Sequence, residues 1–87
     1  MPEQIYARSL RSGETLFREG EEGDNAYIVE TGSIEISIEV AGAKRTIATL
    51  GKDEIIGEMS LIADAPRSAT AVATEDSELL VLKRDRL

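Results

Sequence analysis

The sequence predicts an all-β fold in a single domain. Short apolar runs follow one another along the 87 residues, and turn signals separate them every few positions. The run 34–40 alternates isoleucine or valine with acidic or hydroxyl residues, which is the period of a strand with one buried face. No window keeps an apolar stripe at helical spacing over three turns. We therefore expect a sandwich or barrel of short strands that spans residues 1–87.

The first half of the chain contains three expected strands. Two of them, at 15–18 and 26–30, flank a turn segment with two glycines and an Asp-Asn pair. The third strand, at 34–40, is expected to bury one set of side chains and expose the other: Ile34, Ile36, Ile38 and Val40 inward, and Glu35, Ser37 and Glu39 outward. Turn glycines with positive φ are expected at Gly20, Gly23, Gly32 and Gly57.

The second half continues with a hairpin, a short helix and two more strands. A turn at 41–43 leads into a returning strand at 44–50, with Ile47 facing inward. A helical segment is expected at 57–63 and ends before Pro66, because proline disfavours helix at the preceding residue. Strands at 70–74 and 79–83 follow, and a further helix could begin at 84–87.

The composition excludes several classes of function. Seventeen acidic and 10 basic residues give a net charge of −7, which opposes a nucleic-acid surface and attachment to anionic membranes. The chain has no cysteine and no histidine, so it lacks thiolate ligands and the commonest general base and metal ligand. We expect neither an enzyme nor a metal site. No signal peptide or long apolar run is visible, which favours a cytoplasmic location.

The segment 57–70 carries the chemistry that the rest of the chain lacks. Arg67 offers a planar fork of donors that stays ionised and suits the oxygens of a phosphate diester. Glu58 only accepts hydrogen bonds when ionised, so it can bind a sugar hydroxyl. Alternatively, the two form a plain surface ion pair worth about 0–1 kcal/mol.

The residues around this pair can add donors. Gly57 lets the backbone approach a ligand closely, and the N–H groups around Met59 and Ser60 can face an anion at the start of the helix. Beyond the arginine, Ser68 can supply a backbone N–H and a hydroxyl.

These residues carry a resemblance to the cyclic-nucleotide-binding domains of bacterial transcription activators, kinase regulatory subunits and gated channels. Gly-Glu-Met-Ser-Leu at 57–61, followed by Pro-Arg-Ser-Ala-Thr at 66–70, is similar to the phosphate-binding cassette of that family. The separation of the glutamate and the arginine is the same. The stretches 13–21 and 24–32 are similar to the first two strands and turns of the family.

The resemblance implies a jelly-roll-like β-roll, which is a double-stranded β-helix, with a short helix in the cassette. It implies a non-catalytic regulatory module that binds a cyclic purine nucleotide and relays occupancy to flanking elements or a partner domain. A threonine after the cassette arginine favours guanine in the family, so Ser68 favours cAMP over cGMP. The ligand-binding residues expected are Gly57, Glu58, Met59, Ser60, Arg67, Ser68 and Ala69, with Ile36 and Ile47 as apolar walls around the base. Ile36 and Ile47 also fit a plain core.

The chain departs from the family pattern in three respects. Asp53 stands where the family usually has glycine, and Ile55 stands where it often has an aromatic residue. Family members also end in helices that cover the base. We expect these flanking lid helices to be missing or truncated here.

Two other functions fit parts of the sequence. A degenerate β-roll that only mediates protein contacts would keep the scaffold without a ligand, although Glu58 and Arg67 argue against it. A metal-dependent enzyme of the cupin type would share the roll, but such sites usually rely on histidine.

Overall fold

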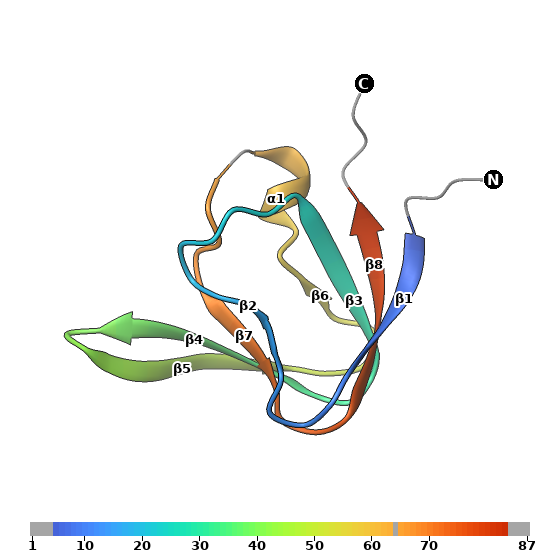
Figure 1. Ribbon diagram of the computed structural model, residues 1–87, viewed down its shortest axis with the longest axis horizontal. Helices are drawn as coiled ribbons and strands as arrows, with labels where there is room; N and C mark the ends of the chain where they lie inside the picture. Colours follow the sequence, from blue (N-terminus) through green and yellow to red (C-terminus); the bar gives the residue numbers. More distant parts are fainter. Residues whose placement is uncertain (1–4, 64, 84–87) are drawn as a thin grey trace.

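Two four-stranded antiparallel sheets make up the described part of the computed structural model, residues 5–63 and 65–83 (Figure 1). One sheet has the order β1-β8-β3-β6, and the other has the order β2-β7-β4-β5. The strands are β1 (Ile5–Leu10), β2 (Thr15–Phe17), β3 (Asn25–Thr31), β4 (Ile34–Val40), β5 (Ala43–Leu50), β6 (Ile55–Ile56), β7 (Thr70–Ala73) and β8 (Ser77–Lys83), and the helix α1 (Met59–Ile62) lies between β6 and β7.

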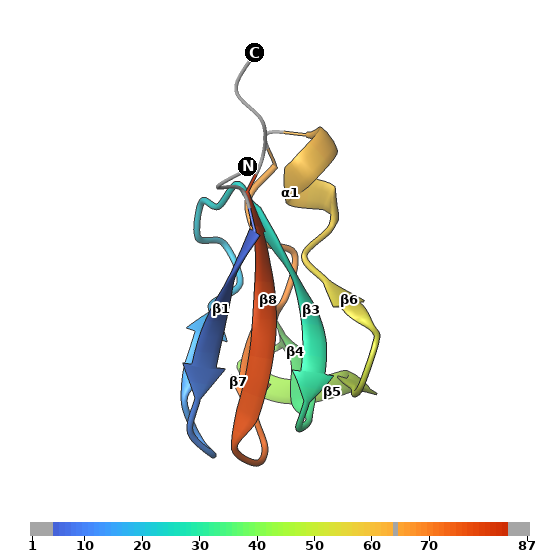
Figure 2. The same ribbon diagram turned by 90° about the vertical axis from the view of Figure 1, so that its right-hand side faces the viewer.

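The chain passes from one sheet to the other at every connection except the β4–β5 hairpin. This winding is that of a β-roll, so the fold class that the sequence and the resemblance predicted is confirmed. Figure 2 shows α1 near one end of β3 and β6. The helix therefore follows directly from the edge of one sheet, and the segment after it returns the chain to the other.

A single apolar cluster fills the space between the sheets. Ile34, Val29, Leu79 and Val81 are each at most 1% exposed, and each such side chain contributes about 1.5–3 kcal/mol by burial. Phe17 and Tyr27 belong to this cluster, and the centroids of their rings lie 6.1 Å apart. The other members are Leu10, Leu16, Ile56, Ala71 and Ala73.

Six strands were predicted within a few residues of their observed bounds, but β1 and β6 were missed. β1 lies at a sheet edge against β8, and its residues 6–9 are all exposed, so it shows no alternation. β6 is only two residues long. The helix expected at 57–63 is shorter than predicted, and the helix start expected at 84–87 lies outside the described residues.

The alternation predicted for β4 is wrong beyond its middle. The pairing with β5 shifts register between Ile36 and Ser37, and such a bulge changes which side chains point inward. Ser37 is buried, whereas Val40 is 44% exposed. Pairing with β7 stops at Ser37, so the far part of the hairpin extends past the sheet (Figure 1).

The hairpin also explains an error at Ile47, which is 55% exposed and not inward. A positive φ was expected at all four turn glycines. It is confirmed at Gly20, Gly32 and Gly57, but Gly23 does not adopt it. Asp53 has a φ of 73°, so the position where the family usually has glycine keeps the left-handed conformation of a turn.

Candidate functional site

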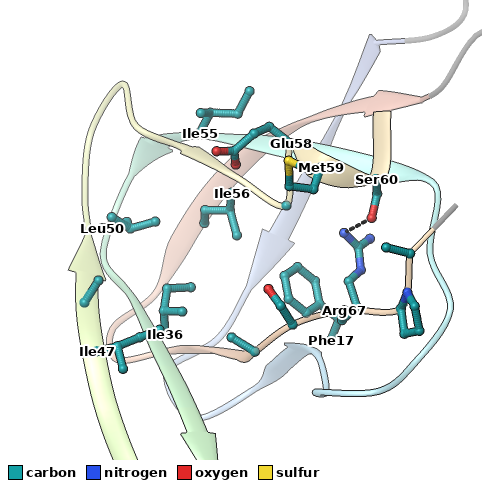
Figure 3. A pocket seen from close by; sticks show the side chains of 16 residues that line it. Phe17, Ile36, Ile47, Leu50, Ile55, Ile56, Glu58, Met59, Ser60 and Arg67 are labelled. Atoms are coloured by element: carbon teal, nitrogen blue, oxygen red, sulfur yellow. Dashed lines mark hydrogen bonds between the residues drawn. The ribbon is translucent and has the colours of Figure 1, made fainter. Parts of the chain in front are cut away.

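An open cavity of about 550 Å³ lies between the segment around α1 and the β4–β5 hairpin (Figure 3). The structure brings all nine sequence-predicted site residues together in its lining: Ile36, Ile47, Gly57, Glu58, Met59, Ser60, Arg67, Ser68 and Ala69. This volume is within the usual range for sites that bind small molecules.

Backbone hydrogen bonds fix the segment that forms one wall of the cavity. Gly57 has a φ of 74°, which turns the chain from β6 into α1. The N–H of Ser60 donates to the Gly57 carbonyl at 3.1 Å, and the N–H of Leu61 donates to the Glu58 carbonyl at 3.0 Å. The sequence had predicted that the Ser60 N–H can face an anion, but this N–H is used in the hydrogen bond to Gly57. Ser60 instead directs its hydroxyl at Arg67.

The loop after α1 returns Arg67 to the β2–β3 turn. The Arg67 N–H donates to the Glu21 carbonyl, and the Gly20 N–H donates to the Arg67 carbonyl, both at 2.8 Å. These two bonds tie the backbone of Arg67 to a segment more than 40 positions earlier in the sequence. These backbone hydrogen bonds hold the main chain of Arg67 in place independently of its side chain.

The side chain of Arg67 is a buried cation without a carboxylate. It is 6% exposed, and its Cζ atom lies 4.1 Å from the centroid of the Phe17 ring and 5.9 Å from that of Tyr27. Its Nη1 donates to Ser60 Oγ at 2.9 Å, while its buried Nε has no hydrogen-bond partner. Over residues 5–63 and 65–83, no carboxylate lies within ion-pair distance of it.

This burial rules out the alternative of a surface ion pair between Glu58 and Arg67. Burying a charge is costly unless it is paired, and here aromatic faces and one hydroxyl supply the compensation. Among residues 5–63 and 65–83, no anionic group compensates the charge of the guanidinium. A ligand with a negative charge could reach it from the cavity that it lines.

Two glycines make room for the guanidinium. A Cβ atom at Gly57 would lie 2.6 Å from Arg67 Nη1, and one at Gly23 would lie 2.5 Å from Nη2. Both distances are shorter than any real Cβ contact tolerates. Gly23 is therefore explained by close approach to Arg67 and not by a positive φ.

The remaining lining divides into an apolar side and a mouth. Ile36, Ile47 and Leu50 lie across the cavity from Arg67 and Ser60 (Figure 3). Ile36 is partly buried against the core, whereas Met59 is 57% exposed at the surface. Glu58 is exposed, and an ionised carboxylate there can accept hydrogen bonds. The arrangement suits a ligand with an anionic end and a flat apolar end.

Sequence reasoning missed several residues of the lining. Phe17 supplies the ring against which Arg67 packs. The chain has only one phenylalanine and two tyrosines, and this scarcity of aromatic residues could have drawn attention to Phe17. Ile55 was noted as a departure from the family pattern, and it proves to line the cavity itself. The other members not predicted are Ala48, Leu50, Ile56, Ala65 and Pro66.

Two kinds of feature are absent from the described residues. Within 5–63 and 65–83, no three His, Cys, Asp or Glu side chains gather so that they could hold a metal ion. None of the helical structure described there has the length and apolar character to cross a membrane.

Comparison with known proteins gives consistent matches. Residues 7–87 match the family model described as "Cyclic nucleotide-binding domain". The chain is 43% identical over 79 residues to the Cyclic AMP receptor protein of Thermus thermophilus, and this match covers 90% of this chain and 37% of that protein. It is 38% identical over 80 residues to the cAMP-dependent protein kinase regulatory subunit of Eremothecium gossypii, which covers 92% of this chain and 17% of that protein.

A solved structure agrees with these matches. The regulatory domain of Toxoplasma gondii PKA, co-crystallised with cAMP, aligns with a TM-score of 0.90 at 30% identity. The alignment covers 94% of this chain and 31% of that one. The chain thus spans well under half of the length of each of these three matched proteins.

Proposed function

The chain belongs to the cyclic nucleotide-binding domain family, and from this premise we propose that its cavity binds a cyclic purine nucleotide as a regulatory ligand. The observation that carries the proposal is the buried guanidinium of Arg67, which lines the cavity and has no carboxylate partner among the described residues. A cyclic phosphate diester has one negative charge on two exocyclic oxygens, and a guanidinium fork binds such a pair well.

The other predicted residues take up the rest of the nucleotide. Glu58 accepts a hydrogen bond from the ribose hydroxyl at the mouth of the cavity. Ile36 and Ile47 pack against the base from the apolar side. Gly57 allows the close backbone approach, and the segment through Ser68 and Ala69 supplies further donors around the phosphate.

We assign cAMP as the preferred ligand over cGMP. The residue after Arg67 is Ser68, whereas a threonine there favours guanine in the family. Two of the relatives are named for cAMP, and the Toxoplasma gondii domain was crystallised with it. The preference would appear as tighter binding of cAMP than of cGMP to the same chain.

The role proposed is signalling and not catalysis. The relatives named above are a receptor protein, a kinase regulatory subunit and a kinase regulatory domain. Residues 1–87 would act as one receptor domain in the cytoplasm, and binding would bias flanking elements or a partner domain. With a net charge of −7, the domain itself would contact neither nucleic acid nor membrane.

Titration of the chain with cAMP, followed by amide chemical shifts, tests the proposal. In the wild type, cAMP should shift the amides of residues 57–69. In Arg67→Ala, these shifts should need a much higher concentration, whereas Lys44→Ala on the hairpin should behave as the wild type. A wild type without shifts at millimolar cAMP would support the degenerate roll, which only contacts proteins.

A further inference from the structure

Ser60 has a buried hydroxyl that is only half used. The residue is 4% exposed, and its Oγ accepts the hydrogen bond from Arg67 Nη1 (Figure 3). A hydroxyl has one hydrogen to donate as well as two lone pairs. Serine in a helix often donates that hydrogen to the carbonyl four residues earlier, but within the described residues Ser60 Oγ donates no such bond.

The hydroxyl with this unused hydrogen is on a residue that lines the same cavity as Arg67. Because the oxygen of Ser60 accepts from the guanidinium, its O–H hydrogen points away from that group. Both residues line the cavity, and Arg67 Nε is also without a partner. The Ser60 hydroxyl therefore keeps an unused hydrogen, on a residue that lines a space a ligand can enter and beside a buried cation whose hydrogen bonds are incomplete.

We propose that Ser60 is a positioning residue for Arg67 and a second donor to the phosphate. The idea rests on the proposed function. In the empty cavity, the hydroxyl oxygen holds Nη1 of Arg67. In the occupied cavity, the hydroxyl hydrogen is donated to the phosphate oxygen that the guanidinium binds. Ser60 thus joins Arg67 and the ligand into one chain of hydrogen bonds.

The surroundings of Arg67 explain why a positioning residue matters. Arginine has many rotamers, and fixing it on binding lowers affinity. Gly23 and Gly57 pack closely against the guanidinium but offer it no side-chain hydrogen-bond partner. Apart from stacking on Phe17 and Tyr27, the bond to Ser60 is what fixes its end within the described residues.

Calorimetry on the full 87-residue chain tests this role, with cAMP as the probe. Ser60→Ala should weaken cAMP binding about 10- to 100-fold, because it removes a hydrogen bond to a charged group. Ser60→Thr, which keeps the hydroxyl, should recover most of the affinity. The control is Ser9→Ala on β1, which removes a hydroxyl far from the cavity and should bind as the wild type.

A second readout separates positioning from simple support of the fold. In the empty protein, Ser60→Ala should shift and broaden the NMR signal of the Arg67 Nε–H. The same substitution is then made in an Arg67→Lys background, and cAMP binding is measured from amide shifts at millimolar cAMP. There, Ser60→Ala should lower the affinity for cAMP much less than it does in the presence of Arg67. Equal losses in both backgrounds would mean a structural role and would overturn the inference.

The outcomes also distinguish this inference from the proposed function. If the wild type binds cAMP and Ser60→Ala binds it equally well, the inference fails and the proposed function stands. If the wild type does not bind a cyclic nucleotide at all, both fail.

Discussion

Two cations of this domain are placed in opposite ways. Lys44 lies on β5 with 64% of its side chain exposed, and its Nζ is 2.9 Å from Oε1 of Glu35. Arg67 is buried against Phe17 and has no carboxylate within the described residues. The exposed cation is paired, while the buried one is not, although burial makes pairing more valuable.

The comparison shows which of the two charges needs an explanation beyond the fold. Hydrogen bonds from Lys44 and from Thr46 hold the pKa of the Glu35 carboxyl below its ordinary value of 4.5. The charge of Lys44 is therefore explained by its surface ion pair with Glu35. Burying a cation without a charged partner is costly, and under the proposed function a bound anion offsets this cost at Arg67. The unpaired burial of Arg67 therefore supports the proposed anion site.

The largest expected effect comes from the glycines that border the buried cation. Gly57→Ala should lower the free energy of unfolding by about 3 kcal/mol, because it combines a strained positive φ with a Cβ atom beside Arg67 Nη1. Chemical denaturation measures the loss. The same change should also weaken cAMP binding by displacing the guanidinium.

Two matched variants separate the causes. Gly42→Ala, at the tip of the hairpin near the exposed pair, has a φ of 81° and no atom near the added Cβ, so it should lose only about 1–2 kcal/mol and keep its affinity. Gly23→Ala has the contact with Arg67 without the positive φ and should mainly lower affinity. Equal binding by all three variants would contradict the close fit around Arg67.

The next effect concerns the carboxylate at the mouth of the cavity. Glu58→Gln keeps the shape but loses the charged acceptor, so cAMP binding should weaken about fivefold, or about 1 kcal/mol. Glu22→Gln, on the exposed β2–β3 turn, makes the same change in net charge away from the cavity. Its affinity should equal that of the wild type. If both variants lose the same affinity, Glu58 acts only through long-range charge.

The smallest effect is expected at the exposed pair. Since the pKa of Glu35 is lowered in the folded state, its contribution to stability is present above pH 4.5 and is lost as the pH falls through the lowered value. Glu35→Gln should therefore show a shallower loss of stability on acidification than the wild type, as measured by urea unfolding at pH 7 and pH 3. Identical pH profiles would show that the pair contributes nothing.

Sequence reasoning succeeded where residue pattern and local geometry agree. The turn glycine at position 57 and the segment that carries Arg67 were predicted, and the structure brings them into one cavity with the other expected residues. Such signals are local, so a reader of the sequence can recover them. The edge strand β1 gave no such signal, because its side chains 6–9 are exposed.

The features that the sequence could not reveal depend on contacts between distant segments. The bulge at Ile36 and Ser37 is set by pairing with β5. Gly23 has its role only because Arg67, over 40 positions later, lies against it. The stacking of Arg67 on Phe17 likewise requires two strands and a loop to meet. Periodicity within one segment contains none of this information.

Thermal unfolding of the wild type and of Arg67→Met, each with and without cAMP, tests the central claim most directly. Without ligand, Arg67→Met should unfold at a higher temperature, because it replaces an unpaired buried cation with an apolar side chain. At 100 times the dissociation constant, cAMP should stabilise the wild type by about 2.7 kcal/mol and leave Arg67→Met unchanged. A wild-type midpoint that millimolar cAMP does not move, or equal shifts in both proteins, would contradict the account.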